Sequence, residues 1–318
     1  MTDSVHGDSA SESGDEEDEL EVREGGFLQL NPKTQRVVDW TVQSLMSTLE
    51  RLVGSRKASN FICDVDGQPI ATSVAETPLE ELVAGLSFHR SPGVLQDIAN
   101  DLALDQNIED QLELYVGTIA SLYPSGNGMF HCFDHAVHVT QTVVQLMSYL
   151  CPKGPSGPTD DLDISSDLLC VFACAFAALI HDVDHPGVPN FKLKAENPKL
   201  ATTYKGRSIA EQHSFTLAWN LLQEERFQDL RQTICPDAAE TTRFRQLVIT
   251  AIIATDLFDA ELNESRQNRW KEAFASTGST CQIQAKVVSA KELADAQATI
   301  VLEHLIQVAD ISHTMQHW

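Results

Sequence analysis

The sequence predicts an all-α fold, because its clearest hydrophobic patterns repeat with the period of an α-helix. Over residues 38–52, apolar side chains recur at spacings of 4, 3, 4 and 3. Over residues 108–122, a second stripe with helical spacing indicates a core-facing helix. Residues 168–180 form an unbroken apolar run, which we expect to be a buried helix.

Length and charge narrow the class of protein. The 318 residues suffice for one large domain or two smaller ones. A formal net charge of −24 argues against nucleic acid or an anionic membrane surface as partner. The same charge repels a phosphate ester, unless bound metal ions reverse the local sign.

Cysteines and apolar runs indicate the compartment. The seven cysteines include no Cys-x-x-Cys pair, which fits a reduced, intracellular protein. No signal peptide opens the chain, and the longest apolar run of 13 residues is too short to span a bilayer. We expect a soluble, cytoplasmic chain, or the cytosolic part of a larger protein.

The first hundred residues divide into three parts. Residues 1–25 hold ten acidic residues and one basic residue, so we expect a disordered tail. Residues 26–58 form an amphipathic helix with Asn31 as N-cap and Pro32 at its first position. Residues 59–99 connect this helix to the domain that follows. Within them, a capping box at Thr77 opens a helix through residue 86, and another helix opens at Ser91.

The amphipathic helix has two interpretations. Its apolar seam suits a coiled coil or homodimer contact through residues 38–52, and it equally suits docking on its own domain. The seam consists of Val38, Val42, Leu45, Leu49 and Leu52.

Two histidines and two aspartates follow directly after the apolar run 168–180. They are His181, Asp182, Asp184 and His185, and a Pro-Gly turn comes next. Charges beside buried apolar surface are costly unless they are paired or bound to a metal. His181 offers a ring nitrogen, and the two oxygens of Asp182 can bridge two ions. The string therefore predicts a metal site.

Further polar residues occur at unusual positions. His131 and His135 share one helix face and His138 follows three residues later, which predicts a functional cluster. Asp310 lies among apolar residues of the last helix, roughly 290–318, so we expect it to be paired or metal-bound. After Asn190 we expect an irregular segment that leads to Arg207. Glu211 has capping-box spacing from Ser208, and this is compatible with a role in the site.

Five strings in this order resemble the class I 3′,5′-cyclic nucleotide phosphodiesterases. The strings are Phe130-His-x-x-x-His135-Ala, His181-Asp-x-x-His-Pro-Gly-x-x-Asn190, Ser208-x-x-Glu-x-His213, Thr255-Asp256 and Ala309-Asp-Ile-Ser312. The resemblance covers roughly residues 100–318. It implies a compact, multi-helix HD-type catalytic domain with a central two-metal pocket. The family's domain continues beyond residue 318, so the resemblance also implies that the C-terminal part is missing.

The resemblance implies a role for each matching residue. A zinc ion would be held by His135, His181, Asp182 and Asp310. Asp182 would bridge to a magnesium or manganese ion, held through waters near His185, Glu211 and Thr255. A hydroxide bridging the ions would attack the phosphate of cAMP or cGMP, and His131 would protonate O3′, giving the 5′-monophosphate. The nucleotide would contact Phe130, Thr255, Leu257, Ile311 and His313.

Some positions depart from the family's pattern. Cys132 stands where asparagine is usual, His138 where aspartate is usual, and His313-Thr314 where Asn-Pro is common. These departures bear on substrate fit more than on metal binding.

The residues themselves are consistent with this chemistry. Two ions can supply a nucleophile at neutral pH and neutralise the phosphorane, and a histidine can be the acid. We expect Glu211 to orient His131. The alternatives are another HD-type metal phosphohydrolase and a non-catalytic regulator that keeps the fold.

Overall fold

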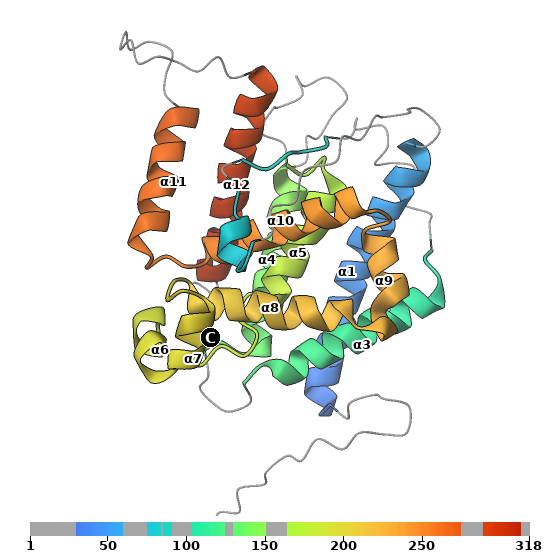
Figure 1. Ribbon diagram of the computed structural model, residues 1–318. Helices are drawn as coiled ribbons and strands as arrows, with labels where there is room; N and C mark the ends of the chain where they lie inside the picture. The colour runs from blue at the N-terminus through green and yellow to red at the C-terminus, as the bar shows by residue number, and fades with distance from the viewer. Residues whose placement is uncertain are drawn as a thin grey trace, which may run out of the picture.

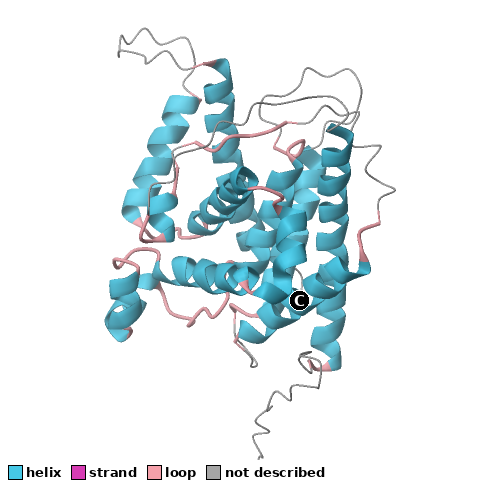
Figure 2. Ribbon diagram, turned by 45° about the vertical axis from the view of Figure 1, so that its right-hand side comes forward, coloured by secondary structure: helices cyan, strands magenta, loops and turns pink. Residues whose placement is uncertain are grey.

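The computed structural model describes residues 30–59, 75–83, 85–90, 103–124, 130–150, 164–274 and 289–312. Within these ranges the chain forms helices and turns but no strand, so the all-α prediction is confirmed (Figure 2). The acidic tail, the helix start at Ser91 and His313 lie outside the described residues. None of the described helices combines the length and the apolar character that crossing a membrane requires.

Eleven α-helices and two short 3₁₀ helices are described. In chain order they are α1 (Pro32–Ser59), η1 (Pro78–Glu81), α3 (Gln106–Leu122), α4 (Phe133–Leu150), α5 (Leu168–Ile180), α6 (Asn190–Glu196), α7 (Pro198–Thr203), α8 (Ile209–Gln223), η3 (Glu225–Phe227), α9 (Gln228–Ile234), α10 (Ala238–Ala254), α11 (Ala260–Ala273) and α12 (Ala290–Ser312).

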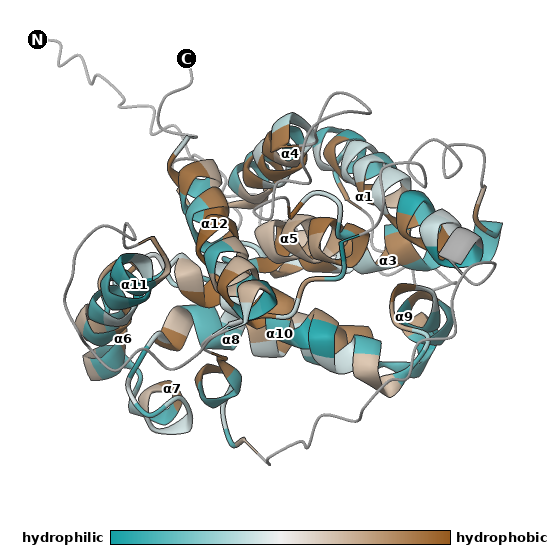
Figure 3. Ribbon diagram, turned by 90° about the horizontal axis from the view of Figure 1, so that it is seen from above, coloured by the Kyte–Doolittle hydropathy of each residue, from teal (hydrophilic) through white to brown (hydrophobic). Residues whose placement is uncertain are grey.

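Helix α5 is the centre of the fold. All 13 of its residues are buried, and α1, α4, α10 and α12 pack around it (Figures 1 and 3). Asp167 caps its first turn by accepting a hydrogen bond from Cys170 N at 3.1 Å. The same carboxylate forms a buried ion pair with Arg243 of α10. Because α5 has no exposed face, it holds the residues at its C-terminal end in a fixed position.

Helix α1 docks on its own domain. It begins as predicted, with Asn31 Oδ1 accepting a hydrogen bond from Thr34 N at 2.9 Å. The whole apolar seam is buried against helices of the same chain, chiefly α3 and α5. Its side chains are therefore not available for the homodimer contact expected through residues 38–52, and the second interpretation of the seam holds.

Two local predictions need correction. The helix expected from Thr77 to Leu86 is a single 3₁₀ turn, Pro78–Glu81. The chain is extended at Leu82 and runs to α12, where Leu86 N donates to Thr299 Oγ1 at 2.9 Å. The segment after Asn190, expected to be irregular, forms the short helices α6 and α7. The first correction follows from the contact with α12, which is distant in the chain. Helix α7 instead begins at a local signal, Pro198 after the cap residue Asn197.

Candidate active site

Three helices bring the four predicted ligands of the first ion together. His135 lies on α4, His181 and Asp182 follow α5, and Asp310 lies on the last turn of α12. His135 Nε2 lies 3.0 Å from Asp310 Oδ1 and 3.7 Å from Asp182 Oδ2. His181 Nε2 lies 3.1 Å from Asp182 Oδ2 and 3.7 Å from Asp310 Oδ1. We call these residues the four-residue cluster.

The separations within the four-residue cluster match those of a tetrahedral zinc site. Four ligand atoms at about 2.1 Å from one ion in a tetrahedron lie about 3.4 Å from each other. The four His-to-Asp separations, 3.0–3.7 Å, fall on both sides of that value. Two imidazoles and two carboxylates are also a donor set that zinc accepts. The residues present therefore fit one ion of this kind.

The hydrogen bonding of His181 gives independent support for a cation. Its Nδ1 lies 2.8 Å from the carbonyl oxygen of Ala178, so Nδ1 carries a proton and donates it. Its Nε2 faces two carboxylate oxygens and makes no hydrogen bond within the described part of the chain. A lone pair that faces carboxylates is repelled unless a metal ion or a proton lies between them. The C-terminal end of α5 adds the negative end of a helix dipole, which also favours a cation.

The charges in the four-residue cluster shift the pKa values of its members. Burial would lower the pKa of His181, but the negative charges of Asp182 and Asp310 outweigh it and raise that pKa well above its usual value. Burial would raise the pKa of Asp182 and of Asp310, but the neighbouring histidines lower both. The carboxylates are therefore ionised at neutral pH and ready to bind a cation.

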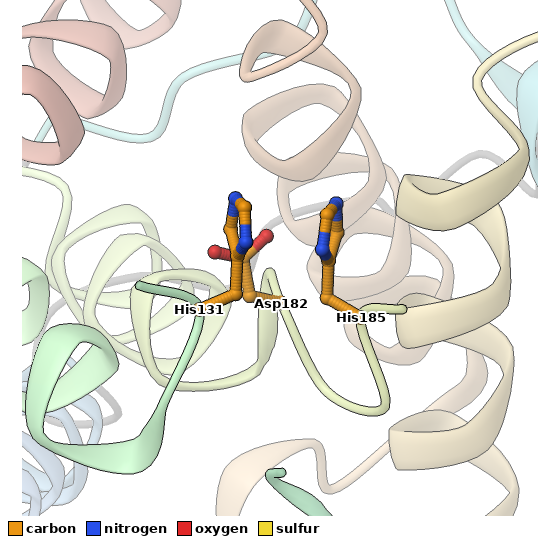
Figure 4. Close-up of side chains that lie close together, drawn as sticks. All are labelled: His131, Asp182 and His185. Carbon is orange, nitrogen blue, oxygen red and sulfur yellow. The ribbon is translucent and has the colours of Figure 1, made fainter. Parts of the chain in front are cut away.

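A second group of potential ligands shares Asp182. The ligand atoms of His131, Asp182 and His185 all lie within 4.8 Å of one another, and we call them the His131–His185 cluster. Figure 4 shows the two rings side by side with the carboxylate next to them. The ring centroids are 3.7 Å apart, with 31° between the ring planes. His138, one turn beyond His135, belongs to neither cluster.

The state of His185 follows from its surroundings. The backbone N–H of Gly187 donates to His185 Nδ1 at 3.0 Å, so the neutral ring carries its proton on Nε2. Burial lowers the pKa of His185 to about 4. Burial also lowers the pKa of His131, although the charge of Asp182 opposes this. At neutral pH His185 is therefore uncharged.

Glu211 belongs to a partly buried hydrogen-bond network with Asn190 and Asp256. Asn190 Nδ2 donates to Glu211 Oε2 at 2.9 Å and lies 3.2 Å from Asp256 Oδ2. Burial, followed by the negative charge of Asp256, raises the pKa of Glu211 to about 7. No hydrogen bond joins Glu211 to His131 among the described residues, so the expected orienting contact is not formed.

The expected capping box of α8 is also absent. Ser208 has a left-handed backbone conformation with φ of 39°, and its side chain makes no hydrogen bond to the start of the helix. Its hydroxyl instead donates to Asp256 Oδ2 at 2.8 Å, 48 residues away. Sequence reasoning assigned no role to Asn190 or Asp256, although both lie in the family strings. The structure makes Asp256 the centre of this network.

The predicted substrate-contacting residues differ in their position relative to the clusters and in their exposure. The ring of Phe130 lies 4.7 Å from the ring of His135 and is 48% exposed. Leu257 and Ile311 expose 38% and 49% of their surface, next to Asp256 and Asp310 in the chain. Thr255 directs its hydroxyl to the carbonyl oxygen of Ile252 at 2.8 Å. Three of the predicted substrate-contacting residues are therefore apolar and exposed.

Comparison with known proteins decides the family. The sequence profile of the 3′,5′-cyclic nucleotide phosphodiesterases matches residues 130–318, more than half of the chain. The chain belongs to this family. The matched region contains both His/Asp clusters, and the family resemblance predicted from the five strings is confirmed.

Several phosphodiesterases are similar to the chain. It is 35% identical over 132 residues to a probable 3′,5′-cyclic-AMP phosphodiesterase of Caenorhabditis elegans, covering 41% of this chain and 18% of that protein. It is 34% identical over 148 residues to 3′,5′-cyclic-AMP phosphodiesterase 4C of Rattus norvegicus, covering 46% of this chain and 25% of that protein. The matched part thus spans a quarter or less of these phosphodiesterases.

Two solved structures are also similar. Both are of the phosphodiesterase domain of a rhodopsin phosphodiesterase from the choanoflagellate Salpingoeca rosetta. Their sequence identities are 22% and 23%, and their TM-scores are 0.46 and 0.49. The alignments cover 65% and 67% of this chain and 56% of each solved chain.

Proposed function

We propose that this chain carries the metal-binding part of a phosphodiesterase active site and hydrolyses a 3′,5′-cyclic nucleotide to the 5′-monophosphate. The observation that carries the proposal is the convergence of His135, His181, Asp182 and Asp310 at separations of 3.0–3.7 Å. Family membership supplies the reaction class. We propose cAMP as the first substrate to test, because both curated relatives are named for it, and cGMP as the second.

We assign the four-residue cluster to a zinc ion and the neighbourhood of Asp182 and His185 to magnesium or manganese. When bound, two such ions neutralise charge on the phosphate and lower the pKa of the attacking water. Asp182 belongs to both clusters and has two oxygens, so one side chain can serve both sites. Its ionised state at neutral pH supports this role.

We assign the proton donor to the departing O3′ to His131. An alkoxide leaving group needs a positioned acid, and histidine is the usual one. His185, with its pKa of about 4, does not carry the extra proton at neutral pH. Burial lowers the pKa of His131 as well, but the negative charge of Asp182 opposes this lowering and favours the protonated ring that the proposed role requires.

We place the nucleotide against the apolar side chains that border the clusters. Phe130 lies beside His135, while Leu257 and Ile311 expose enough apolar surface for a base or ribose. Thr255 and His313 complete the proposed contacts. Glu211 is proposed to act through the network with Asn190 and Asp256, in place of a direct bond to His131.

Incubation of the full chain with cAMP or cGMP, zinc and magnesium tests the proposal. Product should be the 5′-monophosphate, measured by chromatography; chelation should stop its formation and added metal should restore it. Bound metal measured alongside separates the alternatives. Metal binding without turnover of either nucleotide supports a non-catalytic regulator. Turnover of a simple phosphodiester alone supports another metal phosphohydrolase.

A further inference from the structure

A cavity of about 300 Å³ lies between α10, α11, α12 and the two residues that follow η1, Leu82 and Val83. None of its lining residues belongs to either His/Asp cluster. It is nevertheless close to the site along one helix, because Glu303 in its wall precedes Asp310 by seven residues of α12, about 10 Å of helix. A volume of this size accepts a small ligand.

The wall of the cavity contains a buried hydroxyl without a partner. Thr250 of α10 is 1% exposed, and its Oγ1 has no hydrogen-bond partner among the described residues. Comparable buried threonines donate to the carbonyl four residues earlier, as Thr41 does to Val37 at 2.7 Å and Thr299 does to Asp295 at 2.8 Å. An unsatisfied buried hydroxyl is unfavourable. A ligand in the cavity would remove this defect.

The wall also contains a buried positive charge without a counterion. Arg266 of α11 is 8% exposed and donates only to neutral acceptors, Ile253 O at 2.7 Å, Asp256 O at 3.1 Å and Asn263 Oδ1 at 3.1 Å. It forms no salt bridge with any described residue. These bonds use three of the five N–H donors of a guanidinium. Two donors remain, and the nearby carboxylates of Glu303, Asp256 and Asp259 act on Arg266 without pairing with it.

The other charges of the wall cancel. Arg269 Nη2 lies 2.7 and 3.0 Å from the two carboxylate oxygens of Glu303, so this pair is neutral as a unit. The net charge of the wall is therefore the single positive charge of Arg266. Apolar side chains, among them Val83, Ile253 and Leu262, line the remainder. The chain as a whole carries −24, so it repels a polyanion far more strongly than a monoanion.

We propose that this cavity binds a small organic monoanion, a carboxylate with a short apolar body. The carboxylate accepts hydrogen bonds from Arg266 and Thr250, and the apolar body packs on Val83 and Leu262. Arg266 also holds the carbonyls of Ile253 and Asp256 on either side of Thr255. The ligand therefore contacts the residue that fixes the turn at the end of α10.

Calorimetric titration of the full chain with 4-phenylbutyrate tests the site and needs no catalytic turnover, so its outcome is independent of the proposed function. The acid should bind with 1:1 stoichiometry. 4-Phenylbutylamine, with the same body and the opposite charge, should not bind. Absence of acid binding, or equal binding of the amine, would overturn the proposal.

A negative charge introduced at the rim of the cavity tests whether the acid binds there. Ser265 is exposed and lines the cavity, so Ser265→Glu should weaken binding of the acid about tenfold or more. Asn268→Glu adds the same charge to the same exposed side of α11 but outside the cavity lining. That control should change the affinity less than twofold. Equal effects of the two substitutions would place the acid elsewhere.

Removal of the Thr250 hydroxyl gives a second test of the proposed site. Thr250→Val should weaken binding about tenfold and leave the free energy of unfolding unchanged or higher, because Oγ1 has no hydrogen-bond partner within the described ranges. Thr41→Val, an equally buried control on α1, should lower that free energy and leave binding unchanged. Unaltered affinity in both Thr250→Val and Ser265→Glu would show that the acid does not occupy this cavity.

Discussion

His135 and Asp310 face each other, with Nε2 and Oδ1 3.0 Å apart, although 175 positions separate them in the chain. Helices α4 and α12 pack together and hold this contact. This proposed ligand pair comes together only after the chain has folded. We therefore expect metal binding and folding to be linked, so that each bound ion would add to the stability of the folded state.

Removing a ligand from the four-residue cluster should remove metal and activity together. We expect Asp310→Ala and His181→Ala to bind far less zinc by mass spectrometry of the metal, and to hydrolyse no cyclic nucleotide. Asp184→Asn is the matched control, since this exposed carboxylate contacts His213 and lies outside the cluster. Full zinc content in Asp310→Ala would contradict the assignment of the cluster.

His131→Ala should separate metal binding from turnover. His131 is not among the four ligands, so the zinc content should stay at the wild-type value. Loss of a general acid should slow hydrolysis by about 10²–10⁴-fold, measured from product formation at saturating substrate. Loss of zinc from this variant would show that His131 is a ligand and not the acid.

Glu211 should make stability depend on pH in the metal-free chain. Its pKa rises from 4.5 to about 7 on folding, through burial and the charge of Asp256. Between these values the folded chain binds more protons than the unfolded chain, so this contribution is complete below about pH 4.5 and is lost as pH rises through 7.

Urea unfolding in chelator measures this effect. Glu211→Gln cannot titrate, so it should be more stable than the wild type at about pH 8, by on the order of 2–3 kcal/mol, with a smaller gain at about pH 5.5. Glu264→Gln, on the exposed face of α11, is the control and should show no such change. A gain that does not depend on pH would refute the titration of Glu211 as its cause.

Asp167→Ala should strongly destabilise the fold. The substitution removes the cap of α5 and the acceptor of His89 N at 2.7 Å, and it leaves the guanidinium of Arg243 buried without its partner. Removing one member of a buried ion pair costs about 3–5 kcal/mol, measurable by urea unfolding. The double variant Asp167→Ala with Arg243→Met should recover part of this loss. No recovery would mean that the cap, not the unpaired charge, dominates.

Elements with a local pattern could be predicted from the sequence. The buried run of α5 and the stripe of α3 follow from hydrophobic periodicity, and Pro32 marks the start of α1. The residues His181 and Asp182 were found because charges at the end of an apolar run need an explanation. Asp310 was found by the same reasoning, since an acid between apolar neighbours is costly.

Features that depend on distant contacts could not be predicted. The spacing of Ser208 and Glu211 matches a capping box, but Asp256 is the stronger partner and draws the Ser208 hydroxyl away from the helix. Glu211 was expected beside His131, and Asn190 holds it instead. Helix α11 has polar residues on all sides, so hydrophobic periodicity does not reveal it.

The burial of α5 bears on how variants of this protein should be interpreted. Its last turn leads directly into His181, and every one of its side chains lies in the interior. We therefore expect a conservative change within α5, such as one at Phe172, to shift the proposed metal ligands that follow the helix and to weaken metal binding. Inactive variants from a random screen should therefore include many whose substitutions lie away from the proposed catalytic residues. Excess zinc should restore activity to variants that only bind the metal more weakly, and it should not restore variants that have lost a catalytic side chain.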